Sequence, residues 1–521
     1  MNYFLLLLLT FFSYRSGGDR LFDGSPLYQD PDLDLDLDLS AVLRRVDPRF
    51  LSFTIDASLA SEERFMLLLR SQRIRTLATA LSPAFLRFGG TKQDFMVFSP
   101  QRSQHSVRLP WWVEQRLKQD WAQQQLVLTK EEQQNQYNQI HFTELTVDLL
   151  HSFSSCCSLD LIFGLNALLR TAENSWNSSN ARSLLGYCDS KQYKMSWELG
   201  NEPNSFEKKA GIRVDGNQLG VDFTRLRKMM SEFKLYRDAG LFGPDVGQPR
   251  DRRADLLESF LQSGAKAINA CTWHHYYVNG RDTSLEDFLD PDVLDTLALK
   301  TNEVLEVTES PGKPVWLGET SSAYGGGARG LSDTFVSGFM WLDKLGLGAR
   351  LGLDVVMRQV LVGAGSYHMI DDDLDPLPDY WLSLLYKRLV GPEVLKFQLV
   401  SDSGRSKRVR LYLHCANRKS YPGGAVVLIW MNLSRKPVRI SLPALVSSST
   451  VDAFVLQSNQ PGEEGLQSRS VQLNGELLKM VDDKTLPELN GTQFPPAEHL
   501  KLPPYSLGFF VMMDARAPAC S

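Results

Sequence analysis

Between residues 50 and 390, short apolar runs typical of buried strands alternate with longer amphipathic segments typical of helices. Strands are predicted at Leu51–Asp56, Phe85–Gly89, Leu159–Leu165, Met195–Leu199, Gly240–Val246, Ala267–Tyr276, Pro314–Gly318 and Val355–Val360. Apolar helix faces are expected at Leu184–Tyr187, Leu226–Tyr236, Leu256–Leu261, Val293–Val304 and Phe335–Leu347. Because this alternation implies parallel strands, the eight units predict a (β/α)8 TIM barrel. An open doubly wound sheet is the alternative, but Asp56–Leu59 lacks the Gly-rich turn usual there.

The pattern changes after Pro392, where β-branched and apolar runs are separated by Gly, Pro, Ser and Asn. These runs are Lys407–Cys415, Ala425–Asn432, Val451–Leu456 and Leu507–Met512. They predict an all-β C-terminal domain, a β-sandwich.

Near the N-terminal end, Asp and Leu alternate from Asp32 to Leu39, which predicts a strand with one solvent-exposed acidic face and one buried leucine face. A calcium loop is a poor match, because the leucines intervene and glycine is missing.

The segment from Ser99 to Glu144 breaks the barrel rhythm. It is rich in Gln, is charged and has no clear strand, although Trp111 and Trp112 are apolar. Long insertions in a compact domain are usually functional or mobile, so this segment is a candidate for regulation.

The first residues and the cysteines indicate the cellular route. Tyr3–Phe12 is apolar and is followed by small and polar residues through Gly18, which predicts a signal peptide over 1–18 and secretion. No later run is long enough for a transmembrane anchor. Glycosylation sequons begin at Asn177, Asn432 and Asn490. Six cysteines are too few for a disulfide scaffold, but Cys415 and Cys520 bracket the last hundred residues and suggest one bridge.

The net charge of −5 argues against a protein whose whole surface binds polyanions. A local basic groove stays possible, because the field in a cleft depends on nearby charges. Nucleic-acid binding is disfavoured, since the chain has no basic aromatic platform. Without a C-x-x-C pair, a zinc site is not expected, and no cofactor is predicted.

Two carboxylates stand where barrel enzymes keep their catalytic residues, just after strand ends. Glu202 follows the strand ending at Leu199, and Glu319 follows Gly318. Such a pair can cleave a glycosidic bond, one residue protonating the leaving oxygen and the other attacking the anomeric carbon or activating water. Asn201, beside the acid, can hold the sugar 2-hydroxyl. Glu198 is expected inside its strand in a structural role.

A third strand carries His274 and His275, which point to opposite faces because they are neighbours. One is therefore expected in the cleft and the other in packing, and metal ligation by the pair is disfavoured. Tyr276 shares the face of His274 and is expected to hydrogen-bond to the nucleophile. A serine hydrolase is disfavoured, since Gly325–Gly327 is a loop without a nucleophile elbow.

Long motifs at these positions resemble the heparanase family of retaining glycoside hydrolases. They are Trp197–Phe206, Thr272–Arg281, Val315–Gly327 and Pro376–Leu385, with Phe88–Lys92 and Gly243–Pro249 as further matches. The resemblance implies Glu202 as proton donor and Glu319 as nucleophile of an endo-β-glucuronidase acting on heparan sulfate proteoglycan chains, in the extracellular matrix and the lysosome. It implies sugar-subsite residues at Asp56, Thr91, Lys92, Asn201, His274, Tyr276, Arg281, Gly325, Gly326, Gln359, Gly365 and Tyr367.

The resemblance also implies a β-sandwich with a Cys415–Cys520 bridge, and a proenzyme whose linker is excised to leave two non-covalently associated chains. The domains would then be 19–102 with the first barrel strands, the linker 103–134, the rest of the barrel in 135–391 and the sandwich in 392–521. The family's linker has a cysteine that pairs with the counterpart of Cys156, but this linker has none. Cys156 is left to pair with Cys157 or Cys188, or to stay free. The family's cleavage site follows a Tyr-Gln pair, whereas this chain reads Gln133-Gln134.

The family's basic stretches are altered. Asn135–Asp148 has no Lys or Arg, while Arg250, Arg252 and Arg253 remain. We expect a locally basic cleft lined by Lys92, Lys208, Lys209, Arg250, Arg252, Arg253 and Arg281. The alternative for Lys208 and Lys209 is a solvated helix start.

Three further expectations concern the cleft. The carboxyl groups of Glu202 and Glu319 should lie about 5–5.5 Å apart, as in retaining enzymes. Glu202 should have a raised pKa, and Ser103–Gln134 should cover the strand ends with Trp111-Trp112 as an apolar anchor. The alternative functions are a non-catalytic heparan-sulfate-binding relative and an exo-acting β-glucuronidase.

Overall fold

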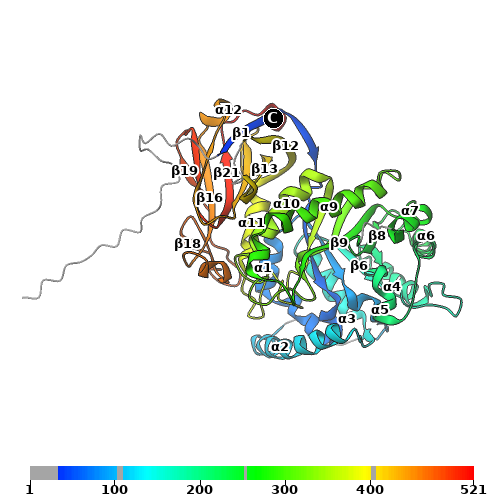
Figure 1. The fold of residues 1–521 in the computed structure, drawn as a ribbon. Coiled ribbons are helices and arrows are strands. Elements are labelled where there is room, and N and C mark those ends of the chain that lie inside the picture. The colour runs from blue at the N-terminus through cyan, green and yellow to red at the C-terminus, as the bar shows by residue number, and fades with distance from the viewer. Residues whose placement is uncertain (1–32, 102–108, 251–254, 401–405) are drawn as a thin grey trace, which may run out of the picture.

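The computed structural model describes residues 33–101, 109–250, 255–400 and 406–521 (Figure 1). The predicted signal peptide, Arg252, Arg253 and the first residues of the linker lie outside these ranges. Within them, no helix combines the length and apolarity needed to cross a membrane.

Eight parallel strands close into a barrel in the order β10-β11-β2-β3-β6-β7-β8-β9, which confirms the eight predicted strands. They are β2 (Leu51–Asp56), β3 (Ala84–Gly89), β6 (Leu159–Leu165), β7 (Ser196–Leu199), β8 (Leu241–Val246), β9 (Ala270–Asn279), β10 (Val315–Tyr324) and β11 (Leu353–Arg358). β9 and β10 run further than predicted, because they keep pairing past the rim as far as Asn279 and Tyr324. Inside the barrel, apolar side chains including Phe85, Phe242 and Trp316 fill one layer.

The barrel is surrounded by helices. They are α1 (Gln72–Ala80), α3 (Glu144–Cys156), α4 (Ser179–Ser190), α5 (Phe206–Ala210), α6 (Gly216–Glu232), α7 (Asp255–Gly264), α8 (Leu285–Phe288), α9 (Pro291–Thr308), α10 (Ser337–Leu351) and α11 (Pro378–Leu389). Five of them lie at the predicted apolar faces: α4, α6, α7, α9 and α10. α6 ends before the predicted Tyr236, which instead packs edge-on against Trp197 of β7.

The C-terminal part is a β structure of eleven strands, as the sequence predicts. Its strands are β12 (Val390–Val400), β13 (Val409–Ala416), β14 (Val426–Asn432), β15 (Val438–Ser441), β16 (Val451–Ser458), β17 (Val471–Leu473), β18 (Glu476–Leu477), β19 (Thr492–Phe494), β20 (His499–Leu502) and β21 (Ser506–Met512), with β1 (Leu33–Arg45) and the short helix α12 (Ala444–Ser447). On β14, Val426, Leu428 and Trp430 enter the core of this domain, while Val427, Ile429 and Met431 join the barrel's core. β14 therefore packs against both cores, and the β domain lies beside the barrel in Figure 1.

The Asp-Leu repeat forms β1 and alternates as predicted. Leu33, Leu35, Leu37 and Leu39 are buried and the intervening aspartates are exposed. β1 pairs antiparallel with β12 and parallel with β15, so it belongs to the C-terminal sheet. The N-terminal segment 19–102 thus supplies strands to both parts of the molecule.

The segment 99–144 contains a 24-residue helix, α2 (Trp111–Gln134), and a short strand, β5 (Ile140–Phe142), which pairs parallel with β4 (Met96–Phe98) just before the segment. The expectation that this segment lacks a strand was therefore wrong at β5. Trp111 and Trp112 are 77% and 60% exposed, so the predicted anchor was also wrong. Leu117 and Trp121 are buried instead, because they lie on the helix face that meets the barrel.

The disulfide between Cys415 and Cys520 is present, and the other four cysteines are free. Among the sequons, Asn177 and Asn490 are exposed. Asn432 is fully buried, and its side-chain nitrogen donates to the carbonyls of Lys436, Leu502 and Pro503. Because this nitrogen would carry the glycan, the prediction of glycosylation at Asn432 was wrong for the folded chain.

Candidate active site

The loop after β7 holds Glu202 through its own backbone. Gly200 has φ +80°, and a side chain there would meet Ala167 at 2.8 Å. The next two amides are bound as well: the Asn201 N–H donates to Asp94 Oδ2 at 2.7 Å, and the Glu202 N–H donates to the Asp245 carbonyl at 2.9 Å. Glu202 itself takes the left-handed conformation, with φ +53°. Its place at the strand end is therefore fixed by neighbouring strands.

Two cations face the carboxylate of Glu202. Lys209 Nζ lies 3.1 Å from one oxygen, and His274 Nδ1 lies 3.3 Å from the other. Burial alone would raise the pKa of Glu202, but Lys209 and His274 outweigh it and lower the pKa below its ordinary value. The expectation of a raised pKa was therefore wrong for this state of the protein. The strand pattern shows neither cation at the carboxylate, since both contacts depend on tertiary structure.

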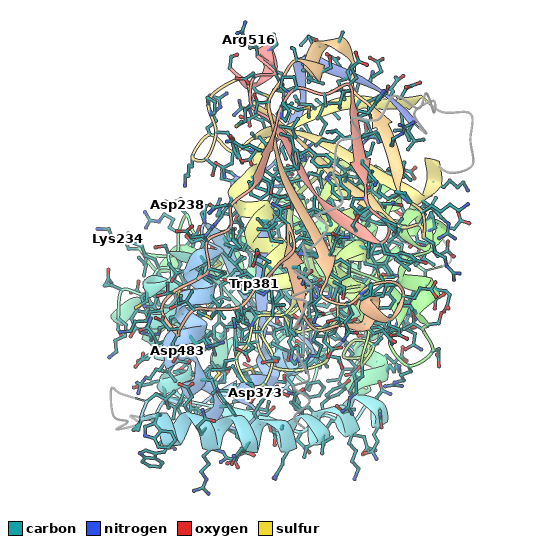
Figure 2. All side chains as sticks on the ribbon, turned by 90° about the vertical axis from the view of Figure 1, so that its left-hand side faces the viewer. Lys234, Asp238, Asp373, Trp381, Asp483 and Arg516 are labelled. Atoms are coloured by element: carbon teal, nitrogen blue, oxygen red, sulfur yellow. A yellow bond between two sulfur atoms is a disulfide. The ribbon has the colours of Figure 1, made fainter. Side chains whose placement is uncertain are left out.

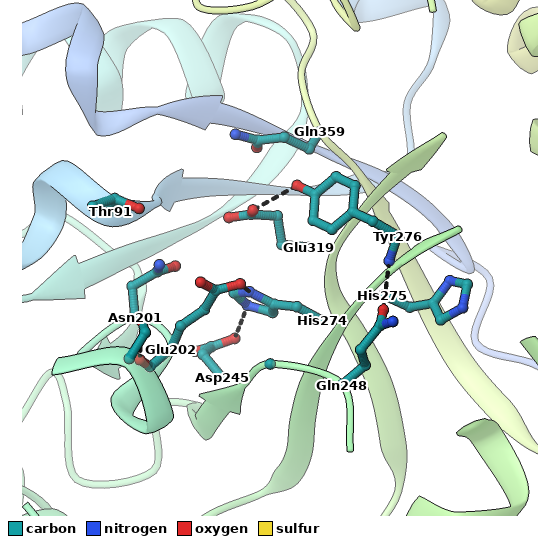
Figure 3. Close-up of polar contacts among 12 residues, drawn as sticks. Thr91, Asn201, Glu202, Asp245, Gln248, His274, His275, Tyr276, Glu319 and Gln359 are labelled. Carbon is teal, nitrogen blue, oxygen red and sulfur yellow. Dashed lines mark hydrogen bonds and ion pairs between the residues drawn. The ribbon is translucent and has the colours of Figure 1, made fainter. Parts of the chain in front are cut away.

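Glu319, on β10, has different partners. The Tyr276 hydroxyl donates to Glu319 Oε1 at 2.6 Å, which confirms the predicted contact, and Arg87 Nη1 donates to Oε2 at 2.9 Å. The Glu319 side chain is 9% exposed, against 26% for Glu202. Figure 3 shows the two carboxylates pointing toward one another, with Gln359 and Thr91 at the border of the space between them.

Arg87, which the sequence reading missed, is fully buried at the centre of this arrangement. Besides Glu319, it donates to Glu198 at 2.7 Å and to the Asn201 side chain at 2.9 Å. Burial would lower the pKa of Arg87, but the surrounding carboxylates raise it well above its ordinary value. A permanent cation therefore ties β3, β7 and β10 together. Glu198 is an internal partner of this cation, in line with the structural role expected for it.

Asp94 and Asp245 were missed as well. Asp94 accepts the amides of Ala167 and Asn201 and is nearly buried, and burial raises its pKa to about 7. Asp245 lies 3.2 Å from His274 Nε2. A lone charged residue inside an apolar strand, such as Arg87 between Leu86 and Phe88, is the sequence signal that finds such groups.

The two histidines differ as the strand alternation predicts. His274 faces the site between Asp245 and Glu202, and despite burial Glu319 and these two partners raise its pKa to about 9. His275 points away in Figure 3 and packs against Trp273 and Tyr277. His274 is thus an imidazolium at neutral pH, and His275 is a packing residue.

Several implied subsite residues gather beside Glu319. Gln359 donates to Asp56 Oδ2 at 2.8 Å, and the Tyr367 and Tyr276 rings lie 6.3 Å apart. A side chain on Gly365 would meet the Gly326 carbonyl at 2.7 Å, so the loops after β10 and β11 need glycine there. Gly325 is exposed at the same turn, with φ +77°.

The predicted basic residues separate into two groups. Lys209 reaches Glu202 and Thr91, and Lys92 is buried in an ion pair with Glu131 of α2. Lys208, Arg250 and Arg281 are exposed. The structure thus brings two of the expected cations to the strand ends around the carboxylates.

Comparisons with known proteins agree with this chemistry. The model of glycosyl hydrolase family 79, N-terminal domain, matches residues 60–346. The chain is 50% identical to heparanase of Mus musculus, covering 94% of each chain, and 38% identical to inactive heparanase-2 of Homo sapiens, covering 93% of this chain and 89% of that one. The solved structure of a 4-O-α-L-rhamnosyl-β-D-glucuronidase from Fusarium oxysporum shares the fold, with TM-score 0.62, 13% identity and coverage of 92% of this chain and 100% of the other.

Proposed function

This chain belongs to glycosyl hydrolase family 79, and we propose that it is a retaining endo-β-glucuronidase that cleaves internal glucuronyl linkages of heparan sulfate. At a coarser level, it is a glycosidase that acts on glucuronide linkages. The proposal depends above all on the contrast between Glu202, faced by Lys209 and His274, and Glu319, held by Tyr276 and Arg87. Two carboxylates in such different settings suit two different roles.

In this mechanism Glu319 attacks the anomeric carbon while Glu202 gives a proton to the leaving oxygen. The glycosyl–Glu319 ester is then hydrolysed by water, from which Glu202 takes a proton. Arg87 and Tyr276 each donate a hydrogen bond to one Glu319 oxygen and so orient the carboxylate for attack. Arg87 donates to the Asn201 side chain and Asp94 accepts from its backbone amide, so Asn201 is held beside Glu202, where it can bind the sugar.

The main alternative is a non-catalytic relative that only binds heparan sulfate. The similarity to inactive heparanase-2 of Homo sapiens makes this worth testing. The two glutamates and their partners favour an enzyme, because a binding protein has no use for a nucleophile aimed by two donors.

The other alternative is an exo-acting β-glucuronidase. The deciding experiment is incubation with size-defined heparan sulfate, with product length read by gel filtration. An endo enzyme gives intermediate lengths early in the reaction. Release of monosaccharide from a chain of nearly constant length would show exo cleavage, and unchanged substrate would show a binding protein.

We further propose that α2 covers the cleft until it is cut. α2 contacts loops that follow three barrel strands: Arg64 after β2 pairs with Asp120, Lys92 after β3 pairs with Glu131, and Asp372 after β11 accepts from Gln125 at 2.7 Å. Those strand ends form the face that carries Glu202 and Glu319, and Figure 2 shows α2 running along one side of the molecule. Because α2 is covalently attached at both ends to the barrel, its effective concentration at this face is high.

Removal of the cover would leave the fold in one piece, because β2 and β3 precede α2 and are built into the barrel. Gln133 and Gln134, the last residues of α2, are exposed and accessible to a protease. In the competing view the segment is a harmless surface loop that is never cut. The test replaces Ser103–Gln134 with a short Gly-Ser linker and compares cleavage of long heparan sulfate chains. Equal activity of the uncut full-length protein would contradict the proposal.

We also propose that the chain enters the secretory route through residues 1–18, with glycans at Asn177 and Asn490. Expression in cultured cells and glycosidase-sensitive mobility of the medium fraction test this. Retention inside the cytosol would contradict it.

A further inference from the structure

Lys209 is placed to act on the acid itself. It lies in α5, the short helix that starts four residues after Glu202, so its side chain folds back over that residue. Lys209 Nζ is 3.1 Å from Glu202 Oε2 and 3.0 Å from Thr91 Oγ1, and its side chain is 9% exposed. The neighbouring Lys208 points into solvent.

This arrangement creates a conflict with the first step of the reaction. A general acid must carry a proton when the leaving oxygen departs. Yet both oxygens of Glu202 face cations, Lys209 on one side and the His274 imidazolium on the other. In the unliganded protein Glu202 is therefore a carboxylate and cannot donate a proton.

We propose that Lys209 is a specificity-determining residue that leaves Glu202 for the anionic group of a uronate sugar when the sugar binds, so that Glu202 takes up a proton from solvent. This inference rests on the proposed function. No covalent step is involved: one ion pair is exchanged for another, and one proton enters from water. Recognition of the substrate's charge is thereby coupled to protonation of Glu202, the general acid.

Lys209, rather than His274, is the partner able to move. His274 sits on the rigid strand β9 and is held from its other side by Asp245 at 3.2 Å. Lys209 stands on a flexible four-carbon stem, and its second contact, Thr91, is neutral. Replacing the Glu202 carboxylate by a sugar carboxylate therefore keeps the lysine paired.

Other charges around the pair bear on the exchange. Burial lowers the pKa of Lys209, but Glu202 above all, with Glu132 on α2 and Glu319 on β10, outweighs burial and raises it. In the exchange, the sugar carboxylate takes the place of Glu202 as the partner that keeps Lys209 charged. Asp94, after β3, feels the charges of Lys209 and of Arg87 on β3, and His274 on β9 stays protonated up to about pH 9. When Lys209 moves away, Glu202 loses one of the two cations that lower its pKa. Burial, which raises the pKa of Glu202, then has a larger net effect. A neutral sugar gives Lys209 no new partner, so Lys209 stays on Glu202 and Glu202 stays deprotonated.

The test measures proton uptake on binding. The full chain is folded and then cut at sites introduced on both sides of 103–134, so that α2 can leave. An aryl β-thioglucuronide and the matched β-thioglucoside, neither of which is hydrolysed, are titrated by calorimetry at pH 6 in buffers of different ionisation enthalpy. We expect uptake of about one proton with the thioglucuronide and almost none with the thioglucoside, because only the uronate charge moves Lys209.

Variants separate this role from a structural one. In Lys209→Met, proton uptake should vanish, and the kcat/KM ratio of aryl glucuronide to aryl glucoside should fall at least about tenfold, the worth of one charged hydrogen bond. For the glucoside, the pH above which kcat/KM falls should be higher in this variant, because Glu202 has lost the cation that lowers its pKa. Lys209→Arg should keep most of the ratio. Lys228→Met, on the exposed face of α6, is the matched control for loss of one positive charge.

Two outcomes would overturn the inference. One is equal proton uptake with both thioglycosides. The other is an equal loss of both activities in Lys209→Met with no change in the pH above which kcat/KM falls, which would mean that the residue only supports the fold. If the cut wild-type chain neither binds nor cleaves any β-glucuronide, the proposed function has failed, and the inference fails with it. If glucuronides are cleaved normally but proton uptake does not depend on the sugar's charge, the role of Lys209 is contradicted and the proposed function still holds.

Discussion

Glu202 and Glu319 are the same residue type at the same kind of place, the end of a barrel strand, yet their partners and their exposure differ. Glu319 is held by a permanent cation, Arg87, and a neutral donor, Tyr276, and both are buried. Glu202 is held by a lysine on a flexible stem and by a titratable imidazolium, and it is more exposed. The fixed setting suits a nucleophile that must always be charged and aimed. The adjustable setting suits an acid whose proton must come and go.

The largest effect should come from removing the nucleophile. Glu319→Gln keeps the side-chain size and the contact to Tyr276, but it has no charge with which to attack. In the chain cut around 103–134, we expect kcat on an aryl glucuronide to fall at least about 10⁴-fold, while binding of a thioglucuronide persists. Stopped or discontinuous assays of phenol release measure this. Retention of a tenth of the activity would move the nucleophile away from Glu319.

Removal of the acid should depend on the leaving group. In Glu202→Gln, cleavage of heparan sulfate should fall by about 10²- to 10⁴-fold, the usual contribution of a general acid. An aryl glucuronide with an acidic phenol should lose much less in its first step, because that phenol leaves without protonation. If both substrates lose equal activity, Glu202 is not the proton donor.

Loosening the nucleophile should have a smaller effect. Tyr276→Phe removes the hydroxyl that lies 2.6 Å from Glu319 and keeps the ring against Tyr367. A hydrogen bond to a charged group is worth about 1.5–3 kcal/mol, so we expect kcat to fall about 10- to 100-fold with little change in KM. A change confined to KM would place Tyr276 in sugar binding alone.

The pH dependence sharpens the same contrast. Because Lys209 and His274 lower the pKa of Glu202, the protonated fraction of the free enzyme falls as pH rises. For a neutral aryl glycoside, kcat/KM should therefore decrease about tenfold per pH unit between pH 5 and 7. A flat profile over that range would contradict the lowered pKa.

The smallest effect concerns stability. A carboxyl whose pKa is lower in the folded than in the unfolded chain stabilises the fold above its unfolded pKa of about 4.3, and this contribution is lost as pH falls through the folded value. Glu202→Gln should thus lower Tm by about 1–3 °C at pH 7, and the difference should shrink toward pH 3. Differential scanning calorimetry at both pH values is the measurement. A difference that grows at low pH has the opposite sign to this expectation.

The sequence was informative where a residue's role follows from local pattern. The period of two in Asp32–Leu39 fixes which face of β1 is buried, and the neighbours His274 and His275 must face opposite ways on β9. Glu202 and Glu319 were found because strand ends carry catalytic groups in barrels. The pairing of β1 with β12, more than three hundred residues away, was not accessible, because an alternating strand does not specify its partner.

The sequence failed where an outcome depends on tertiary neighbours. The pKa of Glu202 was assigned from its presumed role, whereas Lys209 and His274 determine it. Trp111 and Trp112 were read as an anchor by their size, but the register of α2 turns Leu117 and Trp121 inward instead. Arg87 is a lone charged residue in an apolar strand, but this local signal does not reveal its partners, because they lie on β7 and β10 and in the loop after β7.

The covalent bond between Glu319 and the sugar is the central step of the proposed mechanism. A 2-deoxy-2-fluoro-β-glucuronide with an activated leaving group should react with the cut chain and then hydrolyse slowly, because fluorine disfavours the oxocarbenium-like transition state of both steps while the good leaving group speeds the first. Peptide mass spectrometry should find the fluoroglucuronyl group on Glu319 and an unmodified Glu202. A label on Glu202, or the absence of any covalent adduct together with product of inverted configuration, would contradict it.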